Sequence, residues 1–223
     1  DIHCPRTELI TLENALGNGE VMPIDVMEEF ARHARTRGIP IHLDGARLFN
    51  AAYYLGVEAR RVASTADSVM FCLSKGLCSP VGSMVAGTRD FIGEARRKRK
   101  IMGGGMRQAG VIAACGLISL KNLLHRLPED REKAEELASA FGKTGLFEVN
   151  PDPVKINMFF VRYKEPGFHG TEGRLAGELI ARGMLINPPE DGWIRIVTHN
   201  DVSDRDVRRA CSIIQAAAGS VSP

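Results

Sequence analysis

IPIHLDGARLFNAA (residues 39–52) and SVMFCLSKG (residues 68–76) are the two stretches that decide the fold. In the first, an apolar strand ends at Asp44 and runs directly into a helical pattern. In the second, an uninterrupted apolar run ends at Lys75. One helical crossover fits between them, so we expect two neighbouring parallel strands. Both polar side chains would then stand at the carboxyl edge of the sheet, where open α/β sheets bind their ligands.

An acid and an amine that face one crevice are the minimum equipment for holding pyridoxal phosphate. The lysine attaches the cofactor covalently, and the carboxylate pairs with the pyridinium nitrogen and keeps the ring an electron sink. Each residue also has a structural explanation. Asp44 could be the N-cap of the helix that follows, and Lys75 could be a solvated lysine at a strand end. The occurrence of both across one crossover favours the cofactor.

Four motifs carry a resemblance to a known family: HLDGARLFNAA (42–52), LSKGLCSPVGS (73–83), GGGMRQAG (103–110) and IRIVTH (194–199). In their order and spacing they resemble the low-specificity L-threonine aldolases, which are pyridoxal-phosphate enzymes of the aspartate-aminotransferase-like fold. DGAR alone is shared with more distant lyases, but its combination with SKGL and GGGMRQ is specific. The resemblance implies retro-aldol cleavage of threonine and allo-threonine to glycine and acetaldehyde.

The resemblance also implies roles for further polar residues. Ser74 would donate a hydrogen bond to the cofactor phosphate, and Arg107 would contact the cofactor across a subunit interface. Lys100 would contact the cofactor or the substrate. The structural alternatives are a turn cap for Ser74 and, for GGGMRQAG, a flexible break before a helix. GGGMRQAG is not a dinucleotide fingerprint, because it follows a helix rather than a strand.

Two arginines would hold the substrate carboxylate, since a guanidinium pairs with a carboxylate through two parallel hydrogen bonds. Arg195 shares a strand face with its alternate neighbours in WIRIVTH, and it would otherwise pair with an acid such as Asp191 or Asp201. Arg47 lies on the first turn after Asp44, and the alternative for it is a surface arginine. The resemblance favours the substrate for both.

His42 and Asn14 are weaker candidates. His42 precedes Asp44 by two residues on the same strand face and could bond to its carboxylate, although a satisfied core histidine explains it as well. Asn14 closes the strand LITLEN (9–14) and could reach the cofactor or only shape the turn. The family usually has threonine after this asparagine, whereas Ala15 stands here.

Alternating strands and helices predict an α/β fold. We expect residues 1–124 to form part of a large pyridoxal-phosphate-binding domain with a mostly parallel sheet, and residues 125–223 to form a small α+β domain. In the predicted helix 23–38, Val26, Met27, Phe30 and Ala34 mark the buried stripe. In the second domain we predict a helix over 172–183 and a strand over LINPP (185–189).

Composition sets further bounds. The net charge of +2 gives no argument for a nucleic-acid or membrane partner, and the five cysteines form no CxxC pair, which favours a reducing cytoplasm. No apolar run is long enough to span a bilayer, and the histidines form no ligand-spaced set, so we predict no metal site. By resemblance we expect a homotetramer, an absent amino-terminal third with its phosphate-binding loop, and no activity from this stretch alone.

Two other functions stay open at this point. One is another pyridoxal-phosphate lyase or a transaminase on the same scaffold. The other is a nucleic-acid-binding module that uses the basic run from Arg96 to Lys100. The balanced charge and the lack of interleaved aromatic residues weigh against the second.

Overall fold

The computed structural model describes residues 3–164 and 177–221, and the chain divides into two compact units. Unit 1 comprises Asp1–Leu16 and Val21–Leu127. Unit 2 comprises Gly17–Glu20 and Pro128–Pro223. The division therefore falls after Leu127, where we had expected it after residue 124, and the four residues 17–20 leave the first unit for the second.

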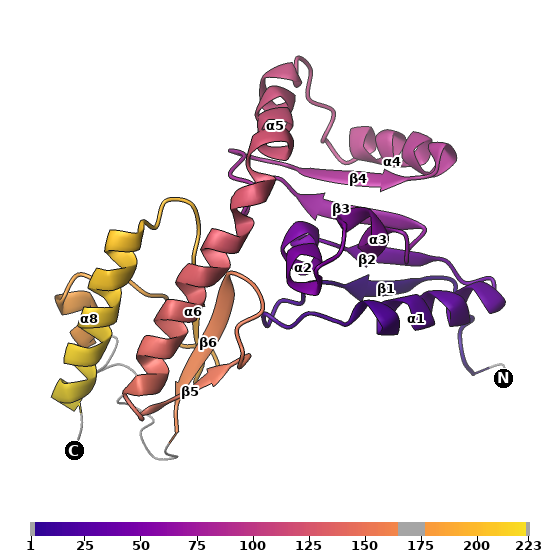
Figure 1. Ribbon diagram of the computed structural model, residues 1–223. Coiled ribbons are helices and arrows are strands. Elements are labelled where there is room, and N and C mark those ends of the chain that lie inside the picture. The colour runs from indigo at the N-terminus through magenta and orange to yellow at the C-terminus, as the bar shows by residue number, and fades with distance from the viewer. Residues whose placement is uncertain (1–2, 165–176, 222–223) are drawn as a thin grey trace. The chain divides into compact units, whose positions relative to one another are not determined.

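Unit 1 is built on a four-stranded sheet, β1 (Ile10–Glu13), β2 (Ile41–Asp44), β3 (Ser68–Cys72) and β4 (Ser83–Gly87), in that order (Figure 1). β1, β2 and β3 are parallel, and β4 runs antiparallel to β3. The expected α/β fold with a mostly parallel sheet is thus confirmed, including the parallel pairing of the strands that lead to Asp44 and Lys75.

The helices of unit 1 are α1 (Ile24–Thr36), α2 (Leu48–Leu55), α3 (Ala59–Ala63), α4 (Arg89–Ile101) and α5 (Gly110–Asn122), followed by the 3₁₀ helix η1 (Leu124–Arg126). The crossover from β2 to β3 holds α2 and α3, where one helix was expected. Gly56 separates them, because its φ of 65° is left-handed and ends α2 in a conformation that glycine adopts without strain.

Side chains alternate across β2, and this decides what Asp44 faces. Ile41 and Leu43 are buried, and the clusters around them include Ala31 of α1 and Leu48 of α2. His42 and Asp44 point to the opposite face, where both are only half-buried. The carboxylate of Asp44 therefore leaves the strand on the side that the helical core does not fill.

Two predicted core positions of α1 are wrong. The helix buries Met27, Ala31 and Ala34, whereas Val26 is half-buried and Phe30 is 45% exposed. A period of 3.6 residues allows either Phe30 or Ala31 to continue the stripe. The small side chain is the one that faces Ile41.

Unit 2 contains α6 (Leu127–Lys143), β5 (Phe147–Asn150), β6 (Met158–Tyr163), β7 (Ile194–Val197) and α8 (Asp204–Val221), with residues 177–181 also helical. The strands form an antiparallel sheet in the order β5-β6-β7. One core joins α6 and α8 to this sheet through residues such as Phe141, Phe159 and Ile214. This is the predicted α+β arrangement.

Two elements were predicted between β6 and β7. The predicted strand 185–189 is wrong: residues 184–189 have no regular structure, since Pro188 and Pro189 have no N–H to give to a ladder. Of the predicted helix 172–183, residues 172–176 lie outside the described residues.

The excursion of residues 17–20 packs within unit 2. The Lys155 ammonium pairs with the Glu20 carboxylate. Gly19 has a φ of 88°, and a Cβ on it would stand 2.8 Å from the carbonyl oxygen of Met158. Only glycine therefore fits there.

Across residues 3–164 and 177–221, no single helix is long and apolar enough to cross a membrane. α5 and the helical stretch Leu124–Lys143 meet that test only when they are taken together as a bent pair.

Candidate active site

The carboxyl ends of β2 and β3 lie at one edge of the sheet, because the two strands are parallel. Asp44, the last residue of β2, stands opposite Met70 in the ladder. β3 ends at Cys72, so the prediction that Lys75 closes the strand is wrong. The chain leaves the ladder at Leu73, and Lys75 stands in the loop that follows β3 at the same edge as Asp44.

Asp44 is not the N-cap of α2. That position is held by Arg47, which makes no side-chain cap bond. Asp44 Oδ1 instead accepts a hydrogen bond of 3.0 Å from the N–H of Ala46. In the described part of the chain, Oδ2 accepts no hydrogen bond. One carboxylate oxygen is thus fixed by the backbone, and the other is left to meet a ligand.

The segment Leu73–Ser79, which we call the lysine loop, is closed on itself. The N–H of Ser79 donates to the Leu73 carbonyl at 3.0 Å, and the N–H of Cys78 donates to the Lys75 carbonyl at 2.9 Å. Leu73 and Leu77 are buried beside Leu127, whereas Ser74 and Lys75 are exposed. Among the described residues the Lys75 amine has no hydrogen bond or ion pair, so it is available for covalent attachment.

The predicted arginines take different positions. Arg47 is half-buried. It follows Asp44 by three residues in the sequence and stands immediately before α2. Arg195 lies on the exposed face of β7 in unit 2, and its Nε donates to the Met158 sulfur at 3.0 Å. Arg195 makes no ion pair with any described residue, so the alternative pairing with Asp191 or Asp201 is wrong.

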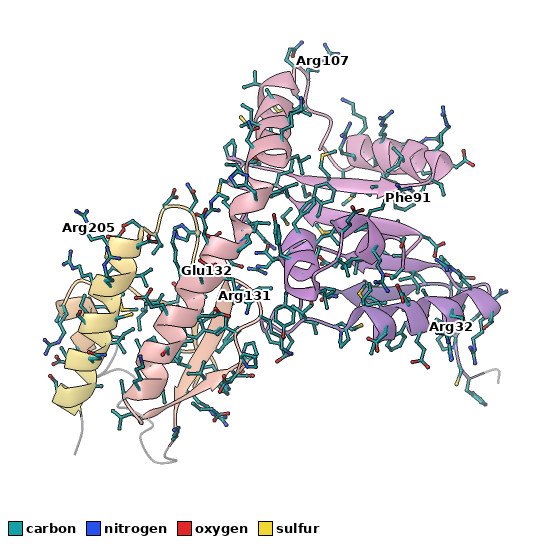
Figure 2. All side chains as sticks on the ribbon, in the orientation of Figure 1. Arg32, Phe91, Arg107, Arg131, Glu132 and Arg205 are labelled. Atoms are coloured by element: carbon teal, nitrogen blue, oxygen red, sulfur yellow. The ribbon has the colours of Figure 1, made fainter. Side chains whose placement is uncertain are left out.

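The remaining predicted residues, Lys100 and Arg107, lie on unit 1 and are both exposed. Figure 2 shows Arg107 at the free end of α5, directed away from the body of that helix. Lys100 belongs to the last turn of α4, and its side chain lies alongside Gly105. The basic run from Arg96 to Lys100 is an exposed helical surface with no buried residue.

His42 and Asn14 have structural roles. His42 Nδ1 lies 2.8 Å from the Ser68 hydroxyl on β3, so its partner is not Asp44. Asn14 is completely buried. Its side-chain oxygen accepts from the N–H of Met22 and its amide nitrogen donates to the Met22 carbonyl, both at 3.1 Å. The interpretations of a satisfied histidine and a turn-shaping asparagine are confirmed.

Three residues without a predicted role fix the lysine loop. Arg126 donates to the Gly76 carbonyl, and the hydroxyls of Ser79 and Ser119 meet in a buried contact of 2.7 Å. The only sequence signal was an arginine set among leucines in NLLHRLPED, which is an unusual place for a charge.

A metal centre and an apolar pocket are two alternatives to this site. In the ranges that the structure describes, no group of three His, Cys, Asp or Glu side chains could hold a metal ion. A pocket of about 480 Å³ in unit 1 is lined mainly by apolar atoms of residues such as Phe49, Tyr53 and Leu124, and it includes neither Asp44 nor Lys75. The polar groups at the sheet edge therefore remain the best candidate.

Comparisons with known proteins identify the family and the fold. The family model described as beta-eliminating lyase matches residues 1–164. Low-specificity L-threonine aldolase 1 of Arabidopsis thaliana is 40% identical over 215 residues, which are 96% of this chain and 60% of that protein. The low specificity L-threonine aldolase of Escherichia coli K12 is 42% identical over 203 residues, 91% of this chain and 58% of that protein.

The fold is also shared with a solved structure. The threonine aldolase of Leishmania major superposes with a TM-score of 0.75 at 17% identity, covering 95% of this chain and 61% of that one. The chain spans about three fifths of the length of the curated relatives that it matches.

Proposed function

We propose that this chain, which belongs to the beta-eliminating lyase family, carries the cofactor lysine and its partner aspartate in a pyridoxal-phosphate enzyme. The reaction would be the retro-aldol cleavage of L-threonine and L-allo-threonine to glycine and acetaldehyde. One observation carries the proposal: an exposed amine on Lys75 and an Asp44 oxygen that no described residue binds stand at the same edge of a mostly parallel sheet. The names of the relatives support the choice of substrate.

The chemistry of these two donors fits the cofactor. Covalent attachment needs an amine that nothing else binds, and the amine of Lys75 meets this condition in the described part of the chain. Pairing with a ring nitrogen needs a carboxylate oxygen on a rigid support. The Asp44 carboxylate has that support, because its other oxygen is bonded to the Ala46 N–H. Pyridoxal phosphate, when bound, supplies a conjugated ring that stabilises negative charge on the substrate α-carbon.

Each residue then has a defined task. Lys75 would hold the cofactor. Asp44 Oδ2 would pair with the ring nitrogen and favour its protonated form, which matters most while charge develops on the substrate. Arg47 and Arg195 would bind the substrate carboxylate and so orient the bond that breaks. Ser74 would bind the cofactor phosphate, Arg107 would contact the cofactor, and Lys100 would contact the substrate.

Assembly as a homo-oligomer, a homotetramer by resemblance, belongs to the proposal. Its support is a run of exposed apolar side chains from the end of α4 through α5, which a second copy would cover: Ile101, Met102, Met106, Val111 and Leu117. Light scattering of the intact protein is the test. A monomer at micromolar concentration would contradict this part of the proposal.

The central test is borohydride reduction of the intact protein loaded with pyridoxal phosphate, followed by peptide mapping. We expect the reduced label on Lys75, and a Lys75→Ala variant should lose both the label and roughly 10²–10⁴-fold of the cleavage rate. Lys121→Ala, which removes an exposed lysine of α5, is the control and should behave as the wild type. A label on another lysine, or a keto acid or ammonia as the product, would overturn the assignment.

A further inference from the structure

Gly76 is the residue of the lysine loop whose own side chain restricts the backbone least. Glycine loses more conformational freedom on folding than any other residue, so the joint directly after Lys75 has the widest choice of backbone angles. The position accepts no larger side chain without a shift, since a Cβ there would stand 2.7 Å from Leu127 Cδ2. The backbone next to the reactive lysine is therefore fixed by its contacts with other residues rather than by a side chain of its own.

Arg126 supplies that contact. Its side chain comes from η1 and is only 6% exposed, and Nη1 donates to the Gly76 carbonyl at 3.3 Å. The same nitrogen lies 3.8 Å from the Cys78 sulfur, on the other side of Leu77. A buried guanidinium is costly unless it is hydrogen-bonded, and hydrogen bonds from a charged donor are stronger than neutral ones. One donor of this charged group thus binds the backbone that follows Lys75.

The rest of the lysine loop is already held by other contacts. Leu73 and Leu77 are buried on either side of Lys75, and Ser79 is bonded to Ser119 of α5. These contacts fix the two ends of the loop. The Gly76 carbonyl accepts two side-chain hydrogen bonds, one from the Cys78 thiol at 3.3 Å and one from Arg126. Of these two donors Arg126 comes from outside the loop, so its bond ties this peptide group to the rest of unit 1.

We propose that Arg126 is a positioning residue for Lys75: by holding the Gly76 carbonyl it fixes the direction in which the lysine side chain leaves the loop. What Lys75 does with that direction rests on the proposed function. The effect of Arg126 on the lysine loop does not, and it is measured without the cofactor.

The test uses Arg126→Met, which removes every donor, and Arg126→Lys, which keeps the charge without the planar guanidinium. Arg35→Met is the matched control, because Arg35 also donates to a backbone carbonyl of unit 1, that of Ser64, at 3.1 Å. Amide hydrogen exchange of peptides covering residues 73–79 is followed in the cofactor-free intact protein, together with alkylation of Cys78 resolved by peptide mapping. Circular dichroism confirms that each variant is folded.

We expect exchange in the lysine loop of Arg126→Met to rise about tenfold, the factor that one charge-assisted hydrogen bond supplies. Cys78 should be alkylated faster, while peptides of β1 and α1 keep their rates. Arg126→Lys should lie between Arg126→Met and the wild type, and Arg35→Met should match the wild type. With pyridoxal phosphate added, the visible band of Arg126→Met should titrate at a different pH from that of the wild type.

Two results would overturn the inference: loop exchange equal to the wild type in a folded variant, or a uniform rise across unit 1, which would indicate general stability only. If Arg126→Met does not fold, Arg126→Lys decides by the same criteria. Failure of the proposed function looks different, because the wild type would then take up no cofactor on Lys75 while the loop exchange still responds to Arg126.

Discussion

Asp44 and Asp67 bracket the same strand: Asp67 Oδ2 accepts the N–H of Ile41 at 2.8 Å where β2 begins, and Asp44 Oδ1 accepts the N–H of Ala46 just after β2 ends. Each carboxylate bonds to one backbone amide, but only Asp44 stands at the carboxyl edge. This gives a matched pair for testing charge. Asn keeps an oxygen acceptor for the backbone bond in both places and removes the charge.

We therefore expect Asp44→Asn to lower the cleavage rate by about 10²–10⁴-fold and to weaken cofactor binding, with little change in the midpoint of thermal unfolding. Asp67→Asn should leave the rate near that of the wild type. Steady-state kinetics and a cofactor titration of both variants are the measurements. Equal rates for Asp44→Asn and the wild type would remove Asp44 from the proposed mechanism.

Gly45 explains why the backbone after Asp44 can lie so close to β3. A Cβ there would stand 2.9 Å from the Met70 carbonyl oxygen, which is backbone and cannot move aside easily. Gly45→Ala should lower the free energy of unfolding by about 1–3 kcal/mol. Gly93→Ala in α4 is the control: nothing lies within 4 Å of its Cβ position, so this change should be neutral or stabilise the helix. Chemical denaturation compares the two, and equal effects would contradict the packing argument.

The buried contact between Ser79 and Ser119 predicts a coupled pair of substitutions. Removing one hydroxyl leaves the other buried without its partner, so each single alanine variant should cost about 1–3 kcal/mol of stability. The double variant should cost clearly less than the sum of the two. Denaturant midpoints of the four proteins complete the cycle, with Ser139→Ala as an exposed control. Strict additivity would show that the two hydroxyls do not interact.

The start of α8 predicts a pH dependence. Asp206 Oδ2 accepts hydrogen bonds from both the hydroxyl and the N–H of Ser203, and these bonds lower the pKa of the Asp206 carboxyl. A lowered pKa in the folded state contributes stability above the unfolded value, about 3.9, and this contribution is lost as the pH falls through the folded pKa. Asp206→Asn should therefore unfold at a lower temperature than the wild type at pH 6. The gap should close below about pH 4, and a gap that is independent of pH would contradict the assignment.

The parts of the fold that the sequence could predict are those set by local pattern. Residues 39–52 and 68–76 contain strand, turn and helix signals that agree with one another, so the parallel pairing of β2 with β3 could be inferred, and with it the shared edge for Asp44 and Lys75. What failed depended on contacts or lengths that carry no period. α3 has five residues, which are too few to show a helical period. In α1 the buried residue is Ala31 and not Phe30.

The site shows the same limit. The chemistry of Lys75 and Asp44 could be inferred from residue types at strand ends, but the support of the lysine loop could not. Arg126 donates to the carbonyl of Gly76, which is 50 residues away in the sequence. The side-chain amide of Asn14 donates to the Met22 carbonyl, and nothing in LITLEN identifies Met22 as its partner. Such pairings depend on which distant segments the tertiary fold brings together. The spacing of residues within one segment does not reveal them.

The excursion of Gly17–Glu20 makes the second unit a composite of two separate stretches of chain. A protein expressed from Pro128 onward would lack residues 17–20. It would therefore lack the packing of Gly19 against the Met158 carbonyl and the ion pair between Glu20 and Lys155. Domain dissection at that junction would therefore yield an incomplete fold. A circular permutation that kept residues 17–20 joined to unit 2 would retain both stretches of that unit.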